Sequence, residues 1–135
     1  MPTSPKTAHA KFEMPSWDEQ PIVEYEGGRK LTHAKVAKKF TGDLVGESVL
    51  EYLMVYPPEP PVPYVGVERF EGTFLGKQGS FAVTITGTYD GRAHEKALII
   101  AGSGTGELAA LRGSWSLGAG HEDKVAGFEI EYWWG

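Results

Sequence analysis

One glutamate lies on a mainly aromatic face of the sequence, which makes it a candidate general acid or base. Residues 64–74 read YVGVERFEGTF, so in an extended chain the even positions put Glu68 on the same face as Tyr64, Phe70 and Phe74. Aromatic surroundings favour the neutral form of a carboxyl group unless a cation pairs with it, and a general acid or base that works near neutral pH can arise in this way. Glu68 is therefore the candidate catalytic residue.

The same carboxylate also has a structural interpretation. An ion pair with Arg112 or Arg69 would make Glu68 part of the framework, and a facing error of one residue would place it on the surface. Glu51 raises the same question within residues 47–56, because it shares a face with apolar side chains of that segment. Arg112 and Glu51 are therefore the candidate structural polar residues.

Tyrosine and phenylalanine side chains supply the expected walls of a pocket. Tyr52 and Tyr56 lie opposite Glu51 in their segment, and they add hydroxyl groups to an apolar pocket if the even-numbered face points inwards. The C-terminal segment puts Trp133 on the outer face, where it is a candidate contact for a neighbouring subunit. The candidate ligand-binding residues are Tyr52, Tyr56, Tyr64, Phe70, Phe74, Phe128 and Tyr132.

Other patterns that often carry chemistry point to structure in this chain. The glycine-rich residues 101–113 have Glu107 where a dinucleotide fingerprint needs glycine, and no Lys-Ser or Lys-Thr pair follows, so we expect a tight turn with one helical turn over 107–110. The sequence has no G-x-S-x-G element of a serine hydrolase. We expect no metal and no cofactor, because no two histidines stand at ligand spacing; they are His9, His33, His94 and His121.

Composition narrows the classes of partner and the compartment. The net charge is -5, with 13 Lys and Arg against 18 Asp and Glu, so nucleic acid is not an expected partner. No cysteine is present, which excludes disulfides and suits a reducing compartment, and we predict a cytoplasmic protein. The first ten residues contain no apolar core of a signal peptide, and the longest aliphatic run, 97–101, is far too short to cross a bilayer.

The elements that must position these side chains are strands. With 135 residues, 18 of them glycine and 9 proline, the chain predicts one all-β domain over residues 1–135, with 1–7 flexible. Five prolines fall in residues 57–63, which we interpret as a stiff connection between strands, although such a stretch can also dock onto an SH3-type or WW-type groove. The predicted strands are 8–13, ended by Pro15, and then 31–40, 47–56, 64–74, 80–89, 93–101, 111–117 and 125–134.

The number and spacing of these strands predict a closed architecture. Short turns and no amphipathic helix between strands favour an antiparallel meander, and eight strands close an up-and-down β-barrel that holds side chains or one small ligand, as lipocalins do.

Several short motifs in one order resemble the DUF3224 family of uncharacterised bacterial proteins. They are SWDE at 16–19, EYLM at 51–54, VGVER at 65–69, GT at 72–73, GSF at 79–81, GTYDG at 87–91, GSGTGELA at 102–109 and LRG at 111–113. The Gly-Ser-Gly turn that leads to Arg-Gly also resembles, more distantly, a turn of allene oxide cyclases and dirigent proteins. The resemblance implies a calycin-like barrel, sometimes dimeric or trimeric, whose characterised relatives guide cyclisation or coupling of an unsaturated small molecule without a cofactor. The catalytic residues of the cyclases match no positions here.

Three functions fit this sequence. The first is a barrel that binds a small hydrophobic or polyunsaturated molecule and acts as a cofactor-independent isomerase or cyclase, with Glu68 as the acid, base or orienting group. The second is a lipocalin-like carrier that needs the same pocket but no catalytic carboxylate. The third is a self-associating structural barrel, a homodimer or homotrimer, whose interior is filled by side chains.

Overall fold

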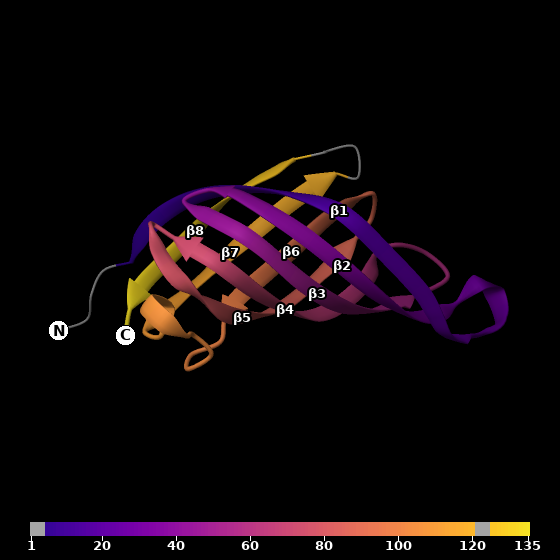
Figure 1. The fold of residues 1–135 in the computed structure, drawn as a ribbon. Coiled ribbons are helices and arrows are strands. Elements are labelled where there is room, and N and C mark those ends of the chain that lie inside the picture. The colour runs from indigo at the N-terminus through magenta and orange to yellow at the C-terminus, as the bar shows by residue number, and fades with distance from the viewer. Residues whose placement is uncertain (1–4, 121–124) are drawn as a thin grey trace.

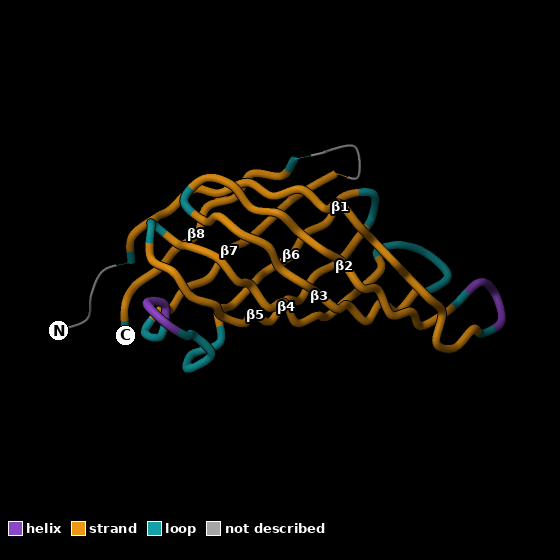
Figure 2. Tube along the Cα trace, in the orientation of Figure 1, coloured by secondary structure: helices purple, strands orange, loops and turns teal. Residues whose placement is uncertain are grey.

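A closed barrel of antiparallel strands forms the computed structural model, which describes residues 5–120 and 125–135 (Figure 1). Strands account for most of the described chain, together with two short 3-10 turns (Figure 2). The strands are β1 Lys6–Glu24, β2 Lys30–Gly42, β3 Leu44–Tyr56, β4 Val62–Phe74, β5 Lys77–Tyr89, β6 Arg92–Ile99, β7 Leu111–Gly120 and β8 Ala126–Trp134; the 3-10 turns are η1 Glu26–Gly28 and η2 Gly106–Leu108.

The strand order around the barrel follows the order in the sequence. Each strand pairs with its sequence neighbours, and β1 pairs with β8 over Lys6–Phe12, which closes the sheet. The predicted up-and-down barrel is confirmed. The even-numbered side chains of β4 point inwards, as predicted for Glu68, and those of β3, whose facing the sequence left open, also point inwards. The proline-rich residues 57–61 connect β3 to β4, as predicted, and the helical turn predicted over 107–110 is η2.

The predicted end of the first strand at Pro15 is wrong, because β1 continues to Glu24. Met14 and Pro15 both stand opposite Lys38 of β2, between the pairs Glu13 with Lys39 and Ser16 with Ala37. Such a bulge leaves one residue out of the ladder, so a proline without an N–H group is accommodated there. The extra residue also changes which positions face inwards, from even numbers before the bulge to odd numbers after it.

Aromatic rings pack the middle of the barrel. Phe40 contacts Phe12, Phe70 and Phe128 at centroid distances between 5.6 and 6.1 Å, and Phe128 also packs against Trp115. Phe81 extends the group through Phe70. We call these six residues the central ring cluster; they are Phe12, Phe40, Phe70, Phe81, Trp115 and Phe128, and all are buried.

The two ends of the barrel differ. At the end where β6 stops and β7 begins, η2 folds against β5 and buries Leu108 completely, beside the termini of the described chain (Figure 1). We call this the η2 end. At the opposite η1 end, β1 and β2 continue as a paired ribbon to Glu24 and Lys30, well past the last pair of β1 with β8 at Phe12 (Figure 1). The inner face of this ribbon therefore extends the barrel wall at the η1 end.

Candidate functional site

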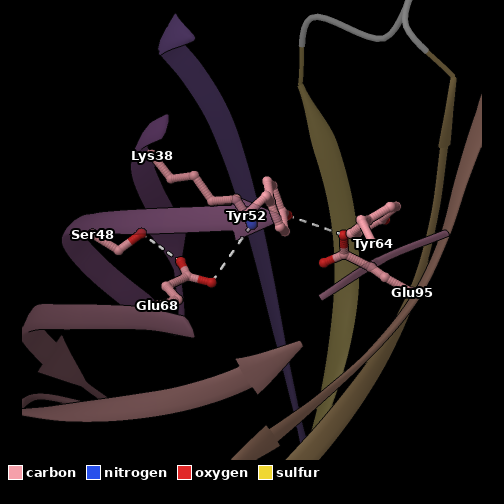
Figure 3. A network of polar contacts seen from close by, with 6 residues as sticks. All are labelled: Lys38, Ser48, Tyr52, Tyr64, Glu68 and Glu95. Atoms are coloured by element: carbon pink, nitrogen blue, oxygen red, sulfur yellow. Dashed lines mark hydrogen bonds and ion pairs between the residues drawn. The ribbon is translucent and has the colours of Figure 1, made fainter. Parts of the chain in front are cut away.

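Polar side chains from β2, β3 and β4 meet inside the barrel wall around Glu68 (Figure 3). Glu68 is 1% exposed, and its Oε1 lies 3.6 Å from Nζ of Lys38, which is 2% exposed. Ser48 donates a hydrogen bond from its hydroxyl to Oε2 of Glu68. Nζ of Lys38 also lies over the ring of Phe12, 4.3 Å from its centroid. The structure confirms that Glu68 is buried among aromatic residues. Its Oε2 accepts the hydrogen bond from Ser48, whereas its Oε1 has the ion pair with Lys38 but no hydrogen bond among the described residues.

The cation beside Glu68 differs from the two arginines that the sequence suggested. Arg69 follows Glu68 on β4, so it points outwards and pairs with Glu71 at 3.2 Å. Arg112 donates from Nη1 to the carbonyl oxygen of Leu111 at 3.1 Å. Glu51 is also on the outer face, where its Oε1 lies 3.0 Å from Nε2 of His33.

Lys38 was missed because a lysine beside Lys39 looks like part of a solvated face. The signal was nevertheless present in the alternation of the segment. Lys38 stands two positions from Val36 and two from Phe40, and both of these are buried.

A second carboxylate lies further towards the η1 end and carries an unpartnered oxygen. Glu95 of β6 is 6% exposed, and its Oε1 accepts hydrogen bonds from the hydroxyl groups of Tyr64 at 2.9 Å and Tyr52 at 3.2 Å (Figure 3). Its Oε2 is buried and has no hydrogen-bond partner among the described residues. Sequence reasoning did not single out Glu95, although its place between Ala93 and Ala97 puts it on an inner face.

The two tyrosines beside Glu95 stay protonated donors around neutral pH. Burial raises the pKa of Tyr52 well above its usual value, and the charge of Glu95 raises it further. Burial also raises the pKa of Tyr64, again with help from the charge of Glu95 and the hydrogen bond to it. Their rings meet edge to face at a centroid distance of 4.9 Å.

Two glycines make room for these rings. A Cβ atom at Gly66 would lie 2.6 Å from the Tyr52 ring, and one at Gly87 would lie 2.7 Å from the Tyr64 hydroxyl oxygen. Each tyrosine therefore lies over a glycine of the next strand, and the absence of a side chain there leaves the space that the ring occupies. Inward-facing glycine in a strand is the sequence signal for this arrangement.

A third polar group forms the rim at the η1 end. Oε2 of Glu19 accepts hydrogen bonds from Tyr56 at 2.5 Å and from Thr32 at 2.7 Å, and Oε1 accepts one from Nε1 of Trp17 at 3.2 Å. The centroid of the Trp17 ring lies 5.9 Å from that of Tyr52, and Trp17 is 45% exposed. Trp17 therefore lies between solvent and Tyr52. The bulge in β1 turns Trp17 and Glu19 inwards.

The hydrogen bonds at the rim shift the pKa values of both partners. Burial acts to raise the pKa of Glu19, but the bonds from Tyr56, Thr32 and Trp17 outweigh burial and lower it overall. Burial and the bond to Glu19 raise the pKa of Tyr56 to about 12. The rim is therefore a carboxylate held by three neutral donors, and the charge of Lys30 adds a smaller stabilising effect.

The structure separates the side chains that were predicted to line one pocket. Tyr52 and Tyr64 lie beside Glu95, and Tyr56 lies at the rim. The remaining predicted wall residues lie elsewhere: Phe70 and Phe128 in the central ring cluster, and Phe74 and Tyr132 in contact with each other and with Trp134 towards the η2 end.

The described residues offer no cluster of three or more groups able to hold a metal ion. His9, His33 and His94 lie at the surface beside single carboxylates, and His121 lies outside the described residues. Trp133 is 36% exposed on the outer face. No helix in the described part of the chain has the length and apolar character needed to span a membrane.

Comparison with protein families decides which family this barrel represents. The model of the family described as "Protein of unknown function (DUF3224)" matches residues 8–132. The chain belongs to the DUF3224 family. A crystal structure of a DUF3224 protein of unknown function from Shewanella oneidensis MR-1 has the same fold: the TM-score is 0.79 at 24% identity, and the match covers 97% of this chain and 98% of that chain.

The comparison with curated proteins gives no match for this DUF3224 protein. The more distant resemblance to allene oxide cyclases and dirigent proteins stays a prediction. The geometry of the DUF3224 barrel itself must therefore carry any functional argument.

Proposed function

We propose that this barrel binds a small molecule with an apolar body and one hydrogen-bond donor group at the layer formed by Tyr52, Tyr64 and Glu95. The observation that carries the proposal is the unpartnered, buried Oε2 of Glu95. A buried polar atom without a partner costs about 1–3 kcal/mol, and more when it is charged. A donor group on a ligand would offset this cost. Oε1 of Glu68 also has no hydrogen bond, but Nζ of Lys38 lies 3.6 Å from it and compensates its charge, whereas Glu95 has no ion pair within the described residues.

Packing inside the barrel supports a site at this level and not deeper. The central ring cluster occupies the middle of the barrel, and η2 with Leu108 packs at the η2 end. The Tyr52 and Tyr64 rings supply apolar surface beside Glu95, and the ring of Trp17 extends this surface through its contact with Tyr52. The idea of a filled structural barrel thus fits the middle, and ligand binding fits the η1 end.

The role of Glu68 in this proposal is structural. Its two oxygens face Lys38 and Ser48, so a ligand reaches neither without breaking a protein contact. If the barrel catalyses an isomerisation or cyclisation, the proton acceptor would be Oε2 of Glu95 and the hydrogen-bond donors would be the two phenols. A carrier that binds a ligand without catalysis needs Oε2 of Glu95 only as a hydrogen-bond acceptor.

Nuclear magnetic resonance tests the proposal on the whole chain. Phenyl compounds that carry an alcohol, a primary amine or a carboxylate are titrated into isotopically labelled protein. We expect at least one class to shift signals of Tyr52, Tyr64, Glu95 and the Trp17 indole N–H. Titrations to millimolar concentration that leave these four unshifted, or that shift only outer-face residues, would contradict the proposal.

A pair of variants distinguishes specific binding at Glu95 from nonspecific binding to the barrel. Glu95→Ala is expected to abolish the shifts, while Glu51→Ala, which removes a carboxylate from the outer face, is expected to keep them. Retained shifts in a folded Glu95→Ala protein would remove Glu95 from the site. If Glu95→Ala does not fold, the positions of the wild-type shifts decide.

A further inference from the structure

We infer that the donor group of the ligand is a primary ammonium, so that the barrel selects amines with an apolar body. This inference rests on the proposed site at Glu95 and names the chemical class that the site prefers. It follows from the balance of charge inside the barrel, from the number of free acceptors and from the aromatic faces around them.

The charges of the inner face leave Glu95 without a cation. Lys38 lies beside Glu68, so these two charges compensate each other. The hydrogen-bond partners of Glu95 are the neutral hydroxyl groups of Tyr52 and Tyr64, and Glu95 forms no ion pair within the described part of the chain. Two donated hydrogen bonds stabilise the negative charge of a carboxylate but do not cancel it. A cationic ligand would supply the missing partner.

The acceptors at this level match the three N–H groups of an ammonium. Oε2 of Glu95 is one acceptor, and each phenol that donates to Oε1 keeps a lone pair on its own oxygen. An alcohol has a single O–H donor and can use only one of these acceptors. A ligand carboxylate has no hydrogen-bond donor, and the negative charge of Glu95 would repel it.

Aromatic faces and the rim favour the same sign of charge. The rings of Tyr52, Tyr64 and Trp17 form a continuous group, and cations are attracted to the faces of such rings within about 6 Å. Glu19 adds a second carboxylate at the rim. Lys30 of β2 lies over the Tyr56 ring, 4.7 Å from its centroid, and its charge also helps to lower the pKa of Glu19, so it offsets part of the negative charge at the rim. The Glu95 oxygens and the Tyr52 and Tyr64 rings further inside have no such cation beside them among the described residues.

Isothermal titration calorimetry with three probes of one skeleton tests the class. The probes are 2-phenylethylammonium, 2-phenylethanol and phenylacetate, which differ only in the charge and donors of the end group. We expect the ammonium to bind at least about tenfold more tightly than the alcohol, because its bond to Oε2 is charge-assisted. We expect no binding of phenylacetate.

Glu95→Gln removes the charge and keeps an amide in place of the carboxylate. The amide oxygen still accepts from the two phenols, and the amide NH2 that replaces Oε2 donates a hydrogen bond, which an alcohol oxygen can accept and an ammonium cannot. This variant is expected to lower the ammonium affinity by about tenfold or more and to leave the alcohol affinity within about threefold. Glu51→Gln removes one negative charge from the outer face and is expected to change neither affinity.

The outcomes separate the inference from the proposed function. Equal affinities for ammonium and alcohol, or an ammonium affinity unchanged in Glu95→Gln, would overturn the amine preference while leaving a ligand site in place. Absence of binding by all three probes would overturn both. If Glu95→Gln does not fold, the wild-type series of three probes decides the question.

Discussion

At the scale of single residues, the barrel interior contains two carboxylates with opposite roles. Glu68 is matched by Lys38 and Ser48, and Glu95 is held by two phenols with one oxygen left over. A buried pair contributes little net stability, but the removal of one partner leaves an uncompensated buried charge. The stability of the protein should therefore respond strongly to Lys38.

We predict that Lys38→Met destabilises the protein by about 3–5 kcal/mol, because it leaves Glu68 charged and unpaired in the core. Urea unfolding followed by circular dichroism measures the change. The double variant Lys38→Met with Glu68→Gln is the control and should recover at least half of the loss. A single variant within about 1 kcal/mol of wild type would show that the pair is not what neutralises Glu68.

The sequence predicted one half of this arrangement. The alternation in residues 64–74 placed Glu68 inside, because a strand alternates its faces and aromatic neighbours mark the inner one. It did not supply the cation, since the partner comes from another strand and depends on the register between them. Glu95 was missed for a different reason: its neighbours on the same face, Ala93 and Ala97, are too small to mark that face as the inner one.

At the scale of elements, β1 decides the shape of the η1 end. Its bulge turns Trp17 and Glu19 inwards, and the bonds from Tyr56 and Thr32 to Glu19 tie the β1 ribbon to β2 and β3. The sequence analysis ended this strand at Pro15, because proline usually interrupts a ladder. Only the pairing with β2 shows that the proline falls in the one position where no N–H group is needed.

The tie at Glu19 predicts a defined pH dependence. The folded protein lowers the pKa of Glu19 below the ordinary 4.5, so its contribution to stability is present above that ordinary value and is lost as pH falls through the lowered value. Glu19→Gln should cost about 1 kcal/mol at neutral pH, since the site is partly exposed. Urea unfolding from pH 7 to pH 3 should show the variant and wild type converging in acid. A difference that grows on acidification would contradict this assignment.

At the η2 end, the buried turn predicts a large effect from a small change. Leu108→Ala should destabilise the protein by about 2–5 kcal/mol, because the side chain is fully buried and leaves a cavity. Leu98→Ala is the matched control on the outer face of β6, where the side chain is 56% exposed, and should cost less than about 1 kcal/mol. Thermal unfolding compares the two. Equal losses would mean that η2 does not close this end.

At the scale of the whole molecule, the barrel is divided along its length into layers. From the η2 end to the η1 end there are five layers. They are the η2 turn, the central ring cluster, the pair of Lys38 and Glu68, the layer of Tyr52, Tyr64 and Glu95, and the rim at Glu19. The sequence predicted the strands, their order and closure, because these follow from local alternation and short turns. It merged the layers into a single pocket, because periodicity gives the facing of a residue but not its height along the barrel.

Two predictions at this scale are still open. Self-association as a homodimer or homotrimer was expected from the family resemblance, with the outward Trp133 as a candidate contact, and a cytoplasmic location was expected from the absence of cysteine. Both stay predictions.

A crystal structure of the protein with 2-phenylethylammonium tests the central claim most directly, because the claim concerns one oxygen atom. We predict the ligand nitrogen within about 3 Å of Oε2 of Glu95, with the phenyl ring against Tyr52, Tyr64 or Trp17. A ligand found only on the outer wall of the barrel at saturating concentration, or Oε2 bonded to a donor of the protein itself, would contradict the claim.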